Sequence, residues 1–425
     1  MRVSKKQSRR RLRRYLISAV TLLLIAGYIL LSRYEQFGAR PEGDAYLRVS
    51  QSENYDTSID QFVNLDPGVL EEMSENMSFW SDPAAFMKSG FAFFSNENQT
   101  SPEQALPEIR ELPATFGNSA GTVKFTWLGH ATVLMSIDDV TILVDPTFSP
   151  SAAPFSWVVK RYQPPAIDLD ALPNIDAIII SHDHYDHLDM ETIKHFIATD
   201  TAFFVPLGVG AHLNRWGVPD SRITELDWWE SARMQSLEFI CMPAQHFSGR
   251  IGFFHNQTSL WASWTVKSAD NTVYFSGDSG YADHYRMIGE RYGPFDLVFM
   301  DAGQYNTRWR QVHNLPDEAV QAFEDVRGKA LVPTGWGMFT LALHDWFEPA
   351  VMIDRMGRKR GLDVIIPRLG EIVDMSARQP LNKWWEALIT LGMRPLECFQ
   401  WWCPRLCPWL CPWWYSLEMN RIQRE

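Results

Sequence analysis

The chain has 425 residues, a formal net charge of −12 and a hydrophobic fraction of 46%. A chain of this length and apolar content can bury a sizeable core, which excludes a disordered protein. The first residues are strongly basic, so the rest of the chain is distinctly acidic, and this argues against a nucleic-acid partner.

The N-terminal end combines a basic cluster with an uncharged apolar run. Lys and Arg dominate residues 2–14, and residues 15–31 (YLISAVTLLLIAGYILL) have about the minimum length of a bilayer-spanning helix. The positive-inside rule predicts a single-pass membrane protein with a cytoplasmic N-terminus and its body on the extracytoplasmic (periplasmic) side. A cleaved secretory signal is the alternative, although the run is long for one and no clear cleavage site follows it.

The composition and residue pattern of the sequence change at three points, which predicts four regions. Residues 1–35 hold the basic end and the predicted anchor, and residues 36–122, polar and broken by Pro and Gly, indicate a linker and a lead-in segment that packs on the main domain. Residues 123–395 contain many short runs rich in β-forming residues, with helix-like stretches between them at 190–198 and 316–326. These patterns predict one layered domain of mixed α and β structure.

The last region, residues 396–425, is dense in Trp, Cys and Pro. Its prolines are too frequent for a continuous helix, and its cysteines do not form the paired spacing of a zinc ribbon. Three interpretations stay open: contact with a membrane interface, a disulfide-bearing tail, and a functionless extension.

Several of the apolar runs end at a side chain that can bind a metal. DAIIIS leads into His182, FICMPAQ into His246 and TVYFSG into Asp278. Strands commonly deliver functional side chains from their ends to one face lined by loops. We therefore expect these three residues to meet in one site.

The strongest signal is a cluster of candidate ligands directly after a predicted strand. It consists of His182, His184, Asp186 and His187, all within six residues. Imidazole nitrogens and carboxylate oxygens suit Zn²⁺ in an open, catalytic geometry, and no thiolate falls in the group. The cluster predicts a metal-binding catalytic site.

The segment SHDHYDHLD, residues 181–189, resembles the signature of the metallo-β-lactamase superfamily. Other segments resemble the branch that contains N-acylphosphatidylethanolamine-hydrolysing phospholipase D and its bacterial relatives. They are TWLGHAT (126–132), LVDP (143–146), ELDWW (225–229), PAQH (243–246), GDSGY (277–281) and GPFDL (293–297). The resemblance covers about residues 115–370 and includes neither the predicted anchor nor the tail.

This resemblance implies a four-layer αββα sandwich with two zinc ions at one edge of its sheets. It implies that the metal-bridging hydroxide is the nucleophile, and it assigns one ligand set to each ion. The first zinc would be held by His182, His184 and His246, the second by Asp186 and His187, and both by Asp278.

One position departs from the family pattern. The last ligand of the second metal is a His in an H-W-G-T-F-like motif, and the matching segment here, PTGWGMF (333–339), has Gly335 at that position. The second site is therefore one ligand short. His344 is the nearest candidate to replace it, and the alternative is that His344 contacts substrate or supports the site.

Four more residues are weighed from their positions. His313 precedes a predicted helix and matches a family His needed for activity, so it is predicted to protonate a leaving group or bind a phosphate oxygen; the alternative is a helix-capping surface His. Tyr185 lies inside the metal motif and is predicted to contact substrate, with its hydroxyl able to bind an oxyanion. His130 is either a support for the site or purely structural. Asp145 either orients a metal-bound His or forms a turn before Pro146.

Three functions remain in competition. The leading hypothesis is a zinc-dependent phosphodiesterase that cleaves an N-acylphosphatidylethanolamine or a related membrane lipid. The second is a metal-dependent hydrolase of a lactone, ester or amide, because the same two-metal chemistry attacks carbonyl groups. The third, motivated by Gly335, is a binding protein with a degenerate metal site. The expected partners are a membrane lipid or other small-molecule substrate and the bilayer; the oligomeric state stays open.

Overall fold

A computed structural model describes residues 13, 15–22, 27, 33–77, 98–250 and 256–392. In these ranges no helix is long and apolar enough to cross a membrane. Residues 15–22 are helical, but much of the predicted anchor, like the whole Trp/Cys/Pro-rich tail, lies outside the described residues. The chain divides into two compact units, residues 1–382 and 383–425, so the predicted domain end at 395 falls inside the second unit.

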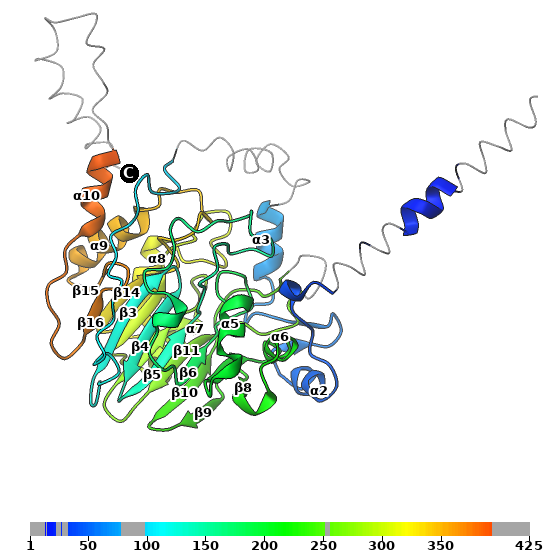
Figure 1. The fold of residues 1–425 in the computed structure, drawn as a ribbon, viewed down its shortest axis with the longest axis horizontal. Coiled ribbons are helices and arrows are strands. Elements are labelled where there is room, and N and C mark those ends of the chain that lie inside the picture. The colour runs from blue at the N-terminus through cyan, green and yellow to red at the C-terminus, as the bar shows by residue number, and fades with distance from the viewer. Residues whose placement is uncertain are drawn as a thin grey trace, which may run out of the picture. The chain divides into compact units, whose positions relative to one another are not determined.

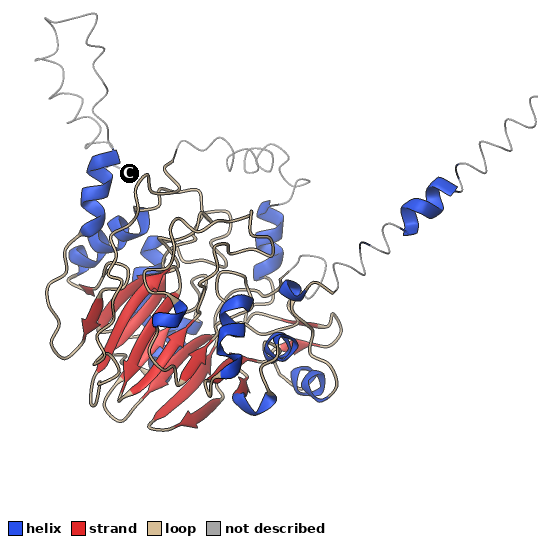
Figure 2. Cartoon of the chain, viewed as in Figure 1, coloured by secondary structure: helices blue, strands red, loops and turns tan. Residues whose placement is uncertain are grey.

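The first unit is built on two seven-stranded sheets (Figures 1 and 2). One sheet has the order β16-β3-β4-β5-β6-β7-β8, and its strands are Ile372–Asp374, Val123–Gly129, Thr132–Ile137, Val140–Val144, Ala177–Ile179, Ala202–Pro206 and Ile223–Leu226. The other has the order β15-β14-β13-β12-β11-β10-β9, and its strands are Asp363–Val364, Ala330–Thr334, Leu297–Asp301, Thr272–Phe275, Ser263–Lys267, Leu237–Met242 and Ser231–Met234. A short hairpin, β1 (Tyr55–Asp56) and β2 (Gln61–Phe62), stands apart from both.

Each sheet is antiparallel on one side and parallel on the other. Strands β5 to β8 are parallel in the first sheet, and β12 to β15 are parallel in the second. Parallel strands need crossover connections, and these carry the helices. In the described residues, these crossovers hold η2 (Leu169–Ala171), α5 (Met190–His195), η3 (Phe196–Ala198), α6 (Gly210–Trp216), η4 (Asp220–Arg222), α7 (His284–Tyr292), α8 (Pro316–Asp325) and α9 (Glu348–Arg360). Before the two sheets come η1 (Glu35–Phe37), α2 (Asp44–Ser50) and α3 (Val69–Met77).

The two sheets pack face to face, and helices cover their outer faces. Phe125 of β3 meets Phe299 of β13 edge to face, and Phe204 of β7 stacks on Phe239 of β10 with ring centroids 3.9 Å apart. A buried apolar cluster joins the first sheet to α5 and α6, and a second joins the other sheet to α7, α8 and α9. The predicted αββα layering is therefore present.

The local signals behind these elements are plain in the sequence. The three apolar runs that lead into His182, His246 and Asp278 form strands β6, β10 and β12, and α8 begins at Pro316, where the fixed φ of proline suits a first helical position. The side chain of Asp189 caps α5 by accepting a hydrogen bond from the backbone of Glu191. Strand β14 was not predicted, because Pro333 and the following glycines weaken its pattern.

The described part of the lead-in segment contacts helix α6 and strand β8. Trp216 of α6 donates its indole N–H to the carbonyl of Glu35, and the backbone of Ala39 bonds to His212 of the same helix. Arg48 of α2 reaches the carbonyl of Glu225 in β8. The part of the second unit that is described is one helix, α10 (Trp384–Gly392).

Candidate metal centre

The site lies where loops leave the ends of strands in both sheets. Strand β6 leads into His182, and β5 leads into Asp145. From the other sheet, β10 leads into His246 and β12 leads into Asp278. The expectation that strand ends would bring the predicted ligands together therefore agrees with the structure.

The first group consists of three histidines, His182, His184 and His246. Nδ1 of His184 lies 2.8 Å from Nε2 of His182 and 3.2 Å from Nε2 of His246. One proton cannot satisfy three nitrogens that converge on one point, whereas a cation bound among them would use a lone pair from each. The predicted ligands of the first metal thus fit a metal ion by their geometry.

Neighbouring groups orient two of these rings. The Nδ1 of His246 faces the carbonyl oxygen of Val312 at 3.0 Å, and the Nδ1 of His182 lies 2.9 Å from the hydroxyl of Ser181. Such contacts direct Nε2 of each ring toward the group. Burial lowers the pKa of both histidines well below the usual value, and neighbouring histidines lower it further. Both rings are therefore neutral, which is the form that binds metal.

The second group contains Asp186, His187 and Asp278. Nε2 of His187 lies 3.1 Å from Oδ2 of Asp278 and 3.6 Å from Oδ2 of Asp186. This nitrogen is buried, and neither carboxylate meets it with hydrogen-bond geometry, which is unusual for a native protein. A bound cation would satisfy it together with both carboxylates, so this group also fits a metal.

Asp145 orients His187, which is one of the two roles weighed for it from the sequence. Its Oδ2 lies 2.7 Å from Nδ1 of His187, and its two oxygens also accept hydrogen bonds from the backbone and hydroxyl of Ser181. Burial by itself lowers the pKa of His187, but Asp278, Asp186 and Asp145 outweigh it and raise that pKa well above the usual value. The surplus of negative charge around His187 is what a divalent cation would neutralise.

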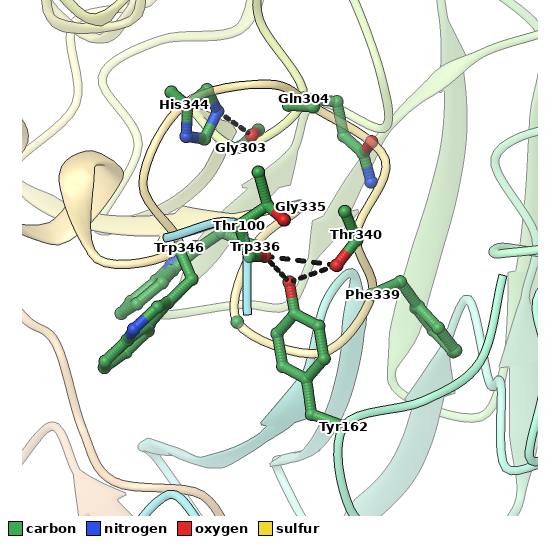
Figure 3. A pocket seen from close by; sticks show the side chains of 12 residues that line it. Thr100, Tyr162, Gly303, Gln304, Gly335, Trp336, Phe339, Thr340, His344 and Trp346 are labelled. Atoms are coloured by element: carbon green, nitrogen blue, oxygen red, sulfur yellow. Dashed lines mark hydrogen bonds between the residues drawn. The ribbon is translucent and has the colours of Figure 1, made fainter. Parts of the chain in front are cut away.

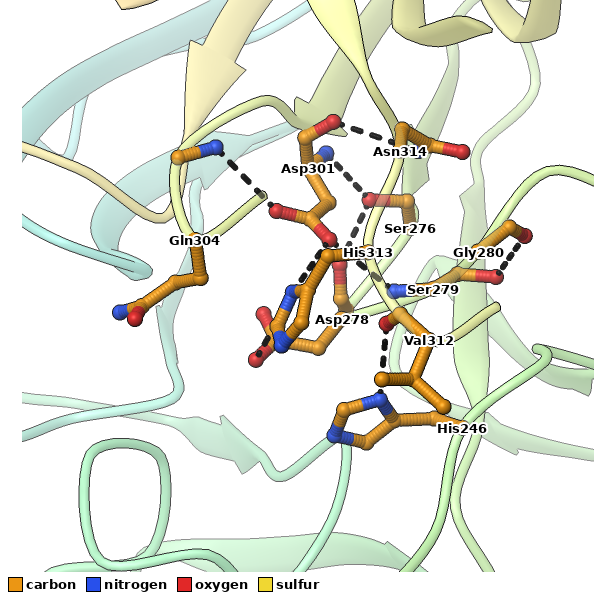
Figure 4. Close-up of polar contacts among 12 residues, drawn as sticks. His246, Ser276, Asp278, Ser279, Gly280, Asp301, Gln304, Val312, His313 and Asn314 are labelled. Atoms are coloured by element: carbon orange, nitrogen blue, oxygen red, sulfur yellow. Dashed lines mark hydrogen bonds and ion pairs between the residues drawn. The ribbon is translucent and has the colours of Figure 1, made fainter. Parts of the chain in front are cut away.

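His313 stands beside both groups. Its Nδ1 lies 3.0 Å from Oδ2 of Asp301 and 3.9 Å from Oδ2 of Asp278 (Figure 4). The carboxylate of Asp301 is buried and also accepts a hydrogen bond from the backbone of Ser279. His313 is therefore an oriented residue of the site and not a surface helix cap.

Three polar residues that support the site were not identified from the sequence. Asn64 of the lead-in segment bonds to both backbone groups of His246, at 2.8 and 3.0 Å. Asp183 is buried in the metal motif and accepts hydrogen bonds from the backbone of Gly249 and the hydroxyl of Ser259. Asp301 is the third. Asp183, which lies between two predicted ligands, and Asp301, which ends the apolar run of β13, had a signal in the sequence, whereas Asn64 had none.

His344 is not brought into either group. Its two ring nitrogens face the backbone oxygens of Asp345 and Gly303, at 2.9 and 2.8 Å, and its ring stacks on Tyr305. The prediction that it replaces the missing ligand is not supported by this geometry. It lines a small pocket together with Gly335 (Figure 3), and its contact with substrate stays a prediction.

Tyr185 packs against the side chain of Arg250. The guanidinium of Arg250 sits 4.0 Å from the centre of its ring, and its hydroxyl is buried without a hydrogen-bond partner. Burial raises the pKa of this phenol to about 12, so the hydroxyl keeps its proton. Its contact with substrate stays a prediction.

Two facing sheets between helices, with His and Asp side chains gathered at the strand ends, define a metal-dependent hydrolase of the metallo-β-lactamase type. The family model described as "Beta-lactamase superfamily domain" matches residues 140–336. An uncharacterized protein of Mycobacterium tuberculosis is 39% identical over 377 residues, which cover 87% of this chain and 98% of the relative.

A relative with a named activity is also similar. N-acyl-phosphatidylethanolamine-hydrolyzing phospholipase D 1 of Caenorhabditis elegans is 33% identical over 305 residues, which cover 67% of this chain and 85% of the relative. A solved metallo hydrolase from the archaeon Ignicoccus hospitalis is 20% identical with a TM-score of 0.48, over 60% of this chain and 98% of that one. The chain belongs to the metallo-β-lactamase superfamily, in the branch that includes this phospholipase D of C. elegans.

Proposed function

We propose that this hydrolase is a zinc-dependent phosphodiesterase of the phospholipase D type that acts on N-acylphosphatidylethanolamine-like membrane lipids. The proposal rests on the two adjacent groups of candidate metal ligands, which Asp278 connects. The carboxylate of Asp278 lies beside His187 of the second group and close to His246 of the first. The relative from C. elegans, named for this activity, supports the choice of substrate.

The chain's own residues would bind and orient the reacting groups. His182, His184 and His246 would hold one ion, Asp186 and His187 the second, and Asp278 both. Two divalent ions held by these residues would lower the pKa of a bound water and neutralise charge on a phosphoryl centre. The buried Asp145 and the carbonyl of Val312 hold His187 and His246 in the tautomer that leaves Nε2 free for a metal. Because these contacts exist before the reaction, no reorganisation of the two rings is needed during it.

We assign to His313 the role of donating a proton to the leaving group. In the hydrolysis, the oxygen of water bonds to phosphorus while the bond from phosphorus to the N-acylethanolamine oxygen breaks. The departing oxygen needs a proton, and a positioned imidazole is a suitable donor. Asp301 holds Nδ1 of His313 at 3.0 Å, which leaves the other ring nitrogen to carry that proton. Phosphatidic acid and an N-acylethanolamine are then the products.

We also propose that the chain acts at a bilayer, with the basic end in the cytoplasm and the hydrolase unit outside it. The apolar run 15–31 ends three residues before Tyr34, which opens an exposed aromatic stack with Phe155 and Trp157. The ring centroids are 5.8 Å apart for Tyr34 and Phe155 and 6.0 Å for Phe155 and Trp157, and Trp157 is 73% exposed. Exposed aromatic side chains suit the interface of a membrane.

The function is tested with the full chain purified in detergent and supplied with zinc. Mixed micelles of N-acylphosphatidylethanolamine are incubated with the protein, and phosphatidic acid and N-acylethanolamine are quantified by mass spectrometry. Phosphatidylcholine, an aryl phosphodiester and a lactone series are run in parallel. Cleavage of lactones alone would replace the proposal by the carbonyl hydrolase, and a zinc-loaded protein inert toward all of them would refute it.

A matched pair of variants separates specific from general effects. His182→Gln removes a proposed ligand and is expected to abolish hydrolysis. His195→Gln changes a histidine at the end of α5, near the exposed Asp170, and is expected to leave hydrolysis unchanged.

The membrane proposal is tested with Trp157→Ser, which is expected to weaken binding to lipid vesicles in a flotation assay. Full retention of binding would contradict this proposal.

A further inference from the structure

The second His/Asp group lacks the ligand that the family pattern supplies from position 335. In this chain Gly335 follows β14 and offers only its backbone. A side chain there would meet two obstacles. The φ of Gly335 is +83°, a conformation that disfavours L side chains, and a Cβ would lie 3.0 Å from Oδ1 of Asp301. A ligand side chain at position 335 would therefore bring both backbone strain and a close contact with Asp301.

The residue beside this gap is His130, at the end of β3. The backbones of His130 and Trp336 form a bridge: the N–H of His130 bonds to the carbonyl of Trp336 at 2.9 Å, and the N–H of Gly335 bonds to the carbonyl of His130 at 3.0 Å. An irregularity in strand pairing between Trp127 and Gly129 precedes it, and His130 itself has a φ of 52°. This local backbone turns the imidazole of His130 into the site.

The ring of His130 reaches the group that is one ligand short. Its Nε2 lies 2.8 Å from Oδ2 of Asp186, and its ring centre is 5.3 Å from that of His187. One ligand atom from each of His130, Asp186 and His187 lies within 4.8 Å of the others. Atoms that surround one zinc ion at about 2.1 Å are separated by roughly 3 to 4 Å, so small movements would let all three share an ion.

Contacts around the ring hold it in this place. His130 is buried, and Phe339 packs edge to face against it with ring centres 5.6 Å apart. The amide nitrogen of Gln304 lies 3.3 Å from Nδ1, and Trp127 donates its indole N–H to the carbonyl of His130. Side chains from β3, the loop after β13 and the loop after β14 thus fix the imidazole before any metal binds.

We propose that His130 is a direct ligand of the second metal and that its Nε2 replaces the side chain that Gly335 lacks. The inference rests on the metal centre of the proposed function and extends it, since His130 comes from the opposite sheet to the one that carries position 335. The second site would then contain His130, Asp186, His187 and Asp278, which are four protein ligands without a contribution from β14.

Metal content tests the proposal independently of any substrate. The full chain in detergent is saturated with zinc, freed of excess metal by gel filtration and analysed by mass spectrometry for zinc per chain. Wild type is expected to retain two ions. His130→Ala is expected to retain one, with affinity for the second ion in a chelator competition reduced by more than the roughly 10- to 100-fold that is typical when only an orienting partner of a ligand is lost. The matched control is His344→Ala, expected to retain two, because both of its ring nitrogens face backbone oxygens.

A second measurement separates a ligand from a residue that only hydrogen-bonds to Asp186, and it needs no variant. In a crystal of the zinc-loaded wild type, anomalous scattering locates both ions. A distance of about 2.0 to 2.2 Å from Nε2 of His130 to the second ion supports the proposal. A distance beyond about 3 Å, a single ion in the wild type, or two ions retained undiminished by His130→Ala would each overturn it. Failure of the lipid assay would leave these results unaffected, so the two proposals fail separately.

Discussion

Replacing Asp145 by Asn tests whether a buried carboxylate prepares His187 for metal. Both carboxylate oxygens accept from donors: Oδ1 from the backbone N–H of Ser181 at 2.7 Å, and Oδ2 from the Ser181 hydroxyl at 2.6 Å and from Nδ1 of His187 at 2.7 Å. An amide has the same shape but one acceptor and one donor end. If its oxygen faces His187, its NH₂ opposes the N–H of Ser181. If it is reversed, the NH₂ faces Nδ1 and favours the tautomer that carries its proton on Nε2.

The expected loss follows from these contacts. One buried donor is left unsatisfied in either orientation, which costs about 1 to 3 kcal/mol in the free energy of unfolding. In the reversed orientation Nε2 is protonated and cannot bind a cation, and loss of such an orienting contact typically weakens metal binding about 10- to 100-fold. The variant Asp145→Asn should therefore be both less stable and weaker at the second metal.

The measurements are denaturant unfolding of the metal-free protein and chelator competition for zinc. Asp270→Asn is the matched control, since Asp270 is exposed in the turn between β11 and β12. The control is expected to change neither quantity. Retention of wild-type zinc affinity by Asp145→Asn would show that the carboxylate does not set the tautomer of His187, and the account of this group would be wrong.

Three further predictions concern other parts of the site and its support. Asn64→Ala removes both hydrogen bonds to the backbone of His246 and should lower the free energy of unfolding by about 1 to 3 kcal/mol; an unchanged denaturation midpoint would contradict this. Gly335→Ala should lose about 1 to 2 kcal/mol from its positive φ and more from crowding, whereas Gly361→Ala, with a similar φ and open space, should lose the first part only; equal losses would refute the crowding. Burial lowers the pKa of His284 to about 3. As the pH falls below about 6.5, this histidine is therefore protonated in the unfolded chain but stays neutral in the folded chain. The stability that His284 contributes is complete above pH 6.5 and is lost as the pH falls toward 3, and His284→Gln should flatten this loss in the metal-free protein.

The class of fold and the centre of the site could be predicted because their signals are local. The buried strands appear as short apolar runs that end at Gly, Pro, Asp or His, and each such run folds as a strand. The residues His182, His184, Asp186 and His187 lie in one turn, so their spacing alone brings them together. His246 and Asp278 could be added because each follows a strand, and strand ends in such folds share a face.

Contacts between distant segments decided the rest. Asn64 supports His246 across 182 residues, and Gln304 contacts His130 across 174. His344 is near Gly335 in the sequence, yet its ring turns to the carbonyl of Gly303, while His130 reaches Asp186 from the other sheet. Periodicity and spacing report which face of a strand or helix a residue occupies, and they carry no information on which loops the packing of two sheets brings side by side. The sequence by itself therefore determined the metal motif, and only the tertiary structure decided which side chains orient it and which histidine lies at the position left open by Gly335.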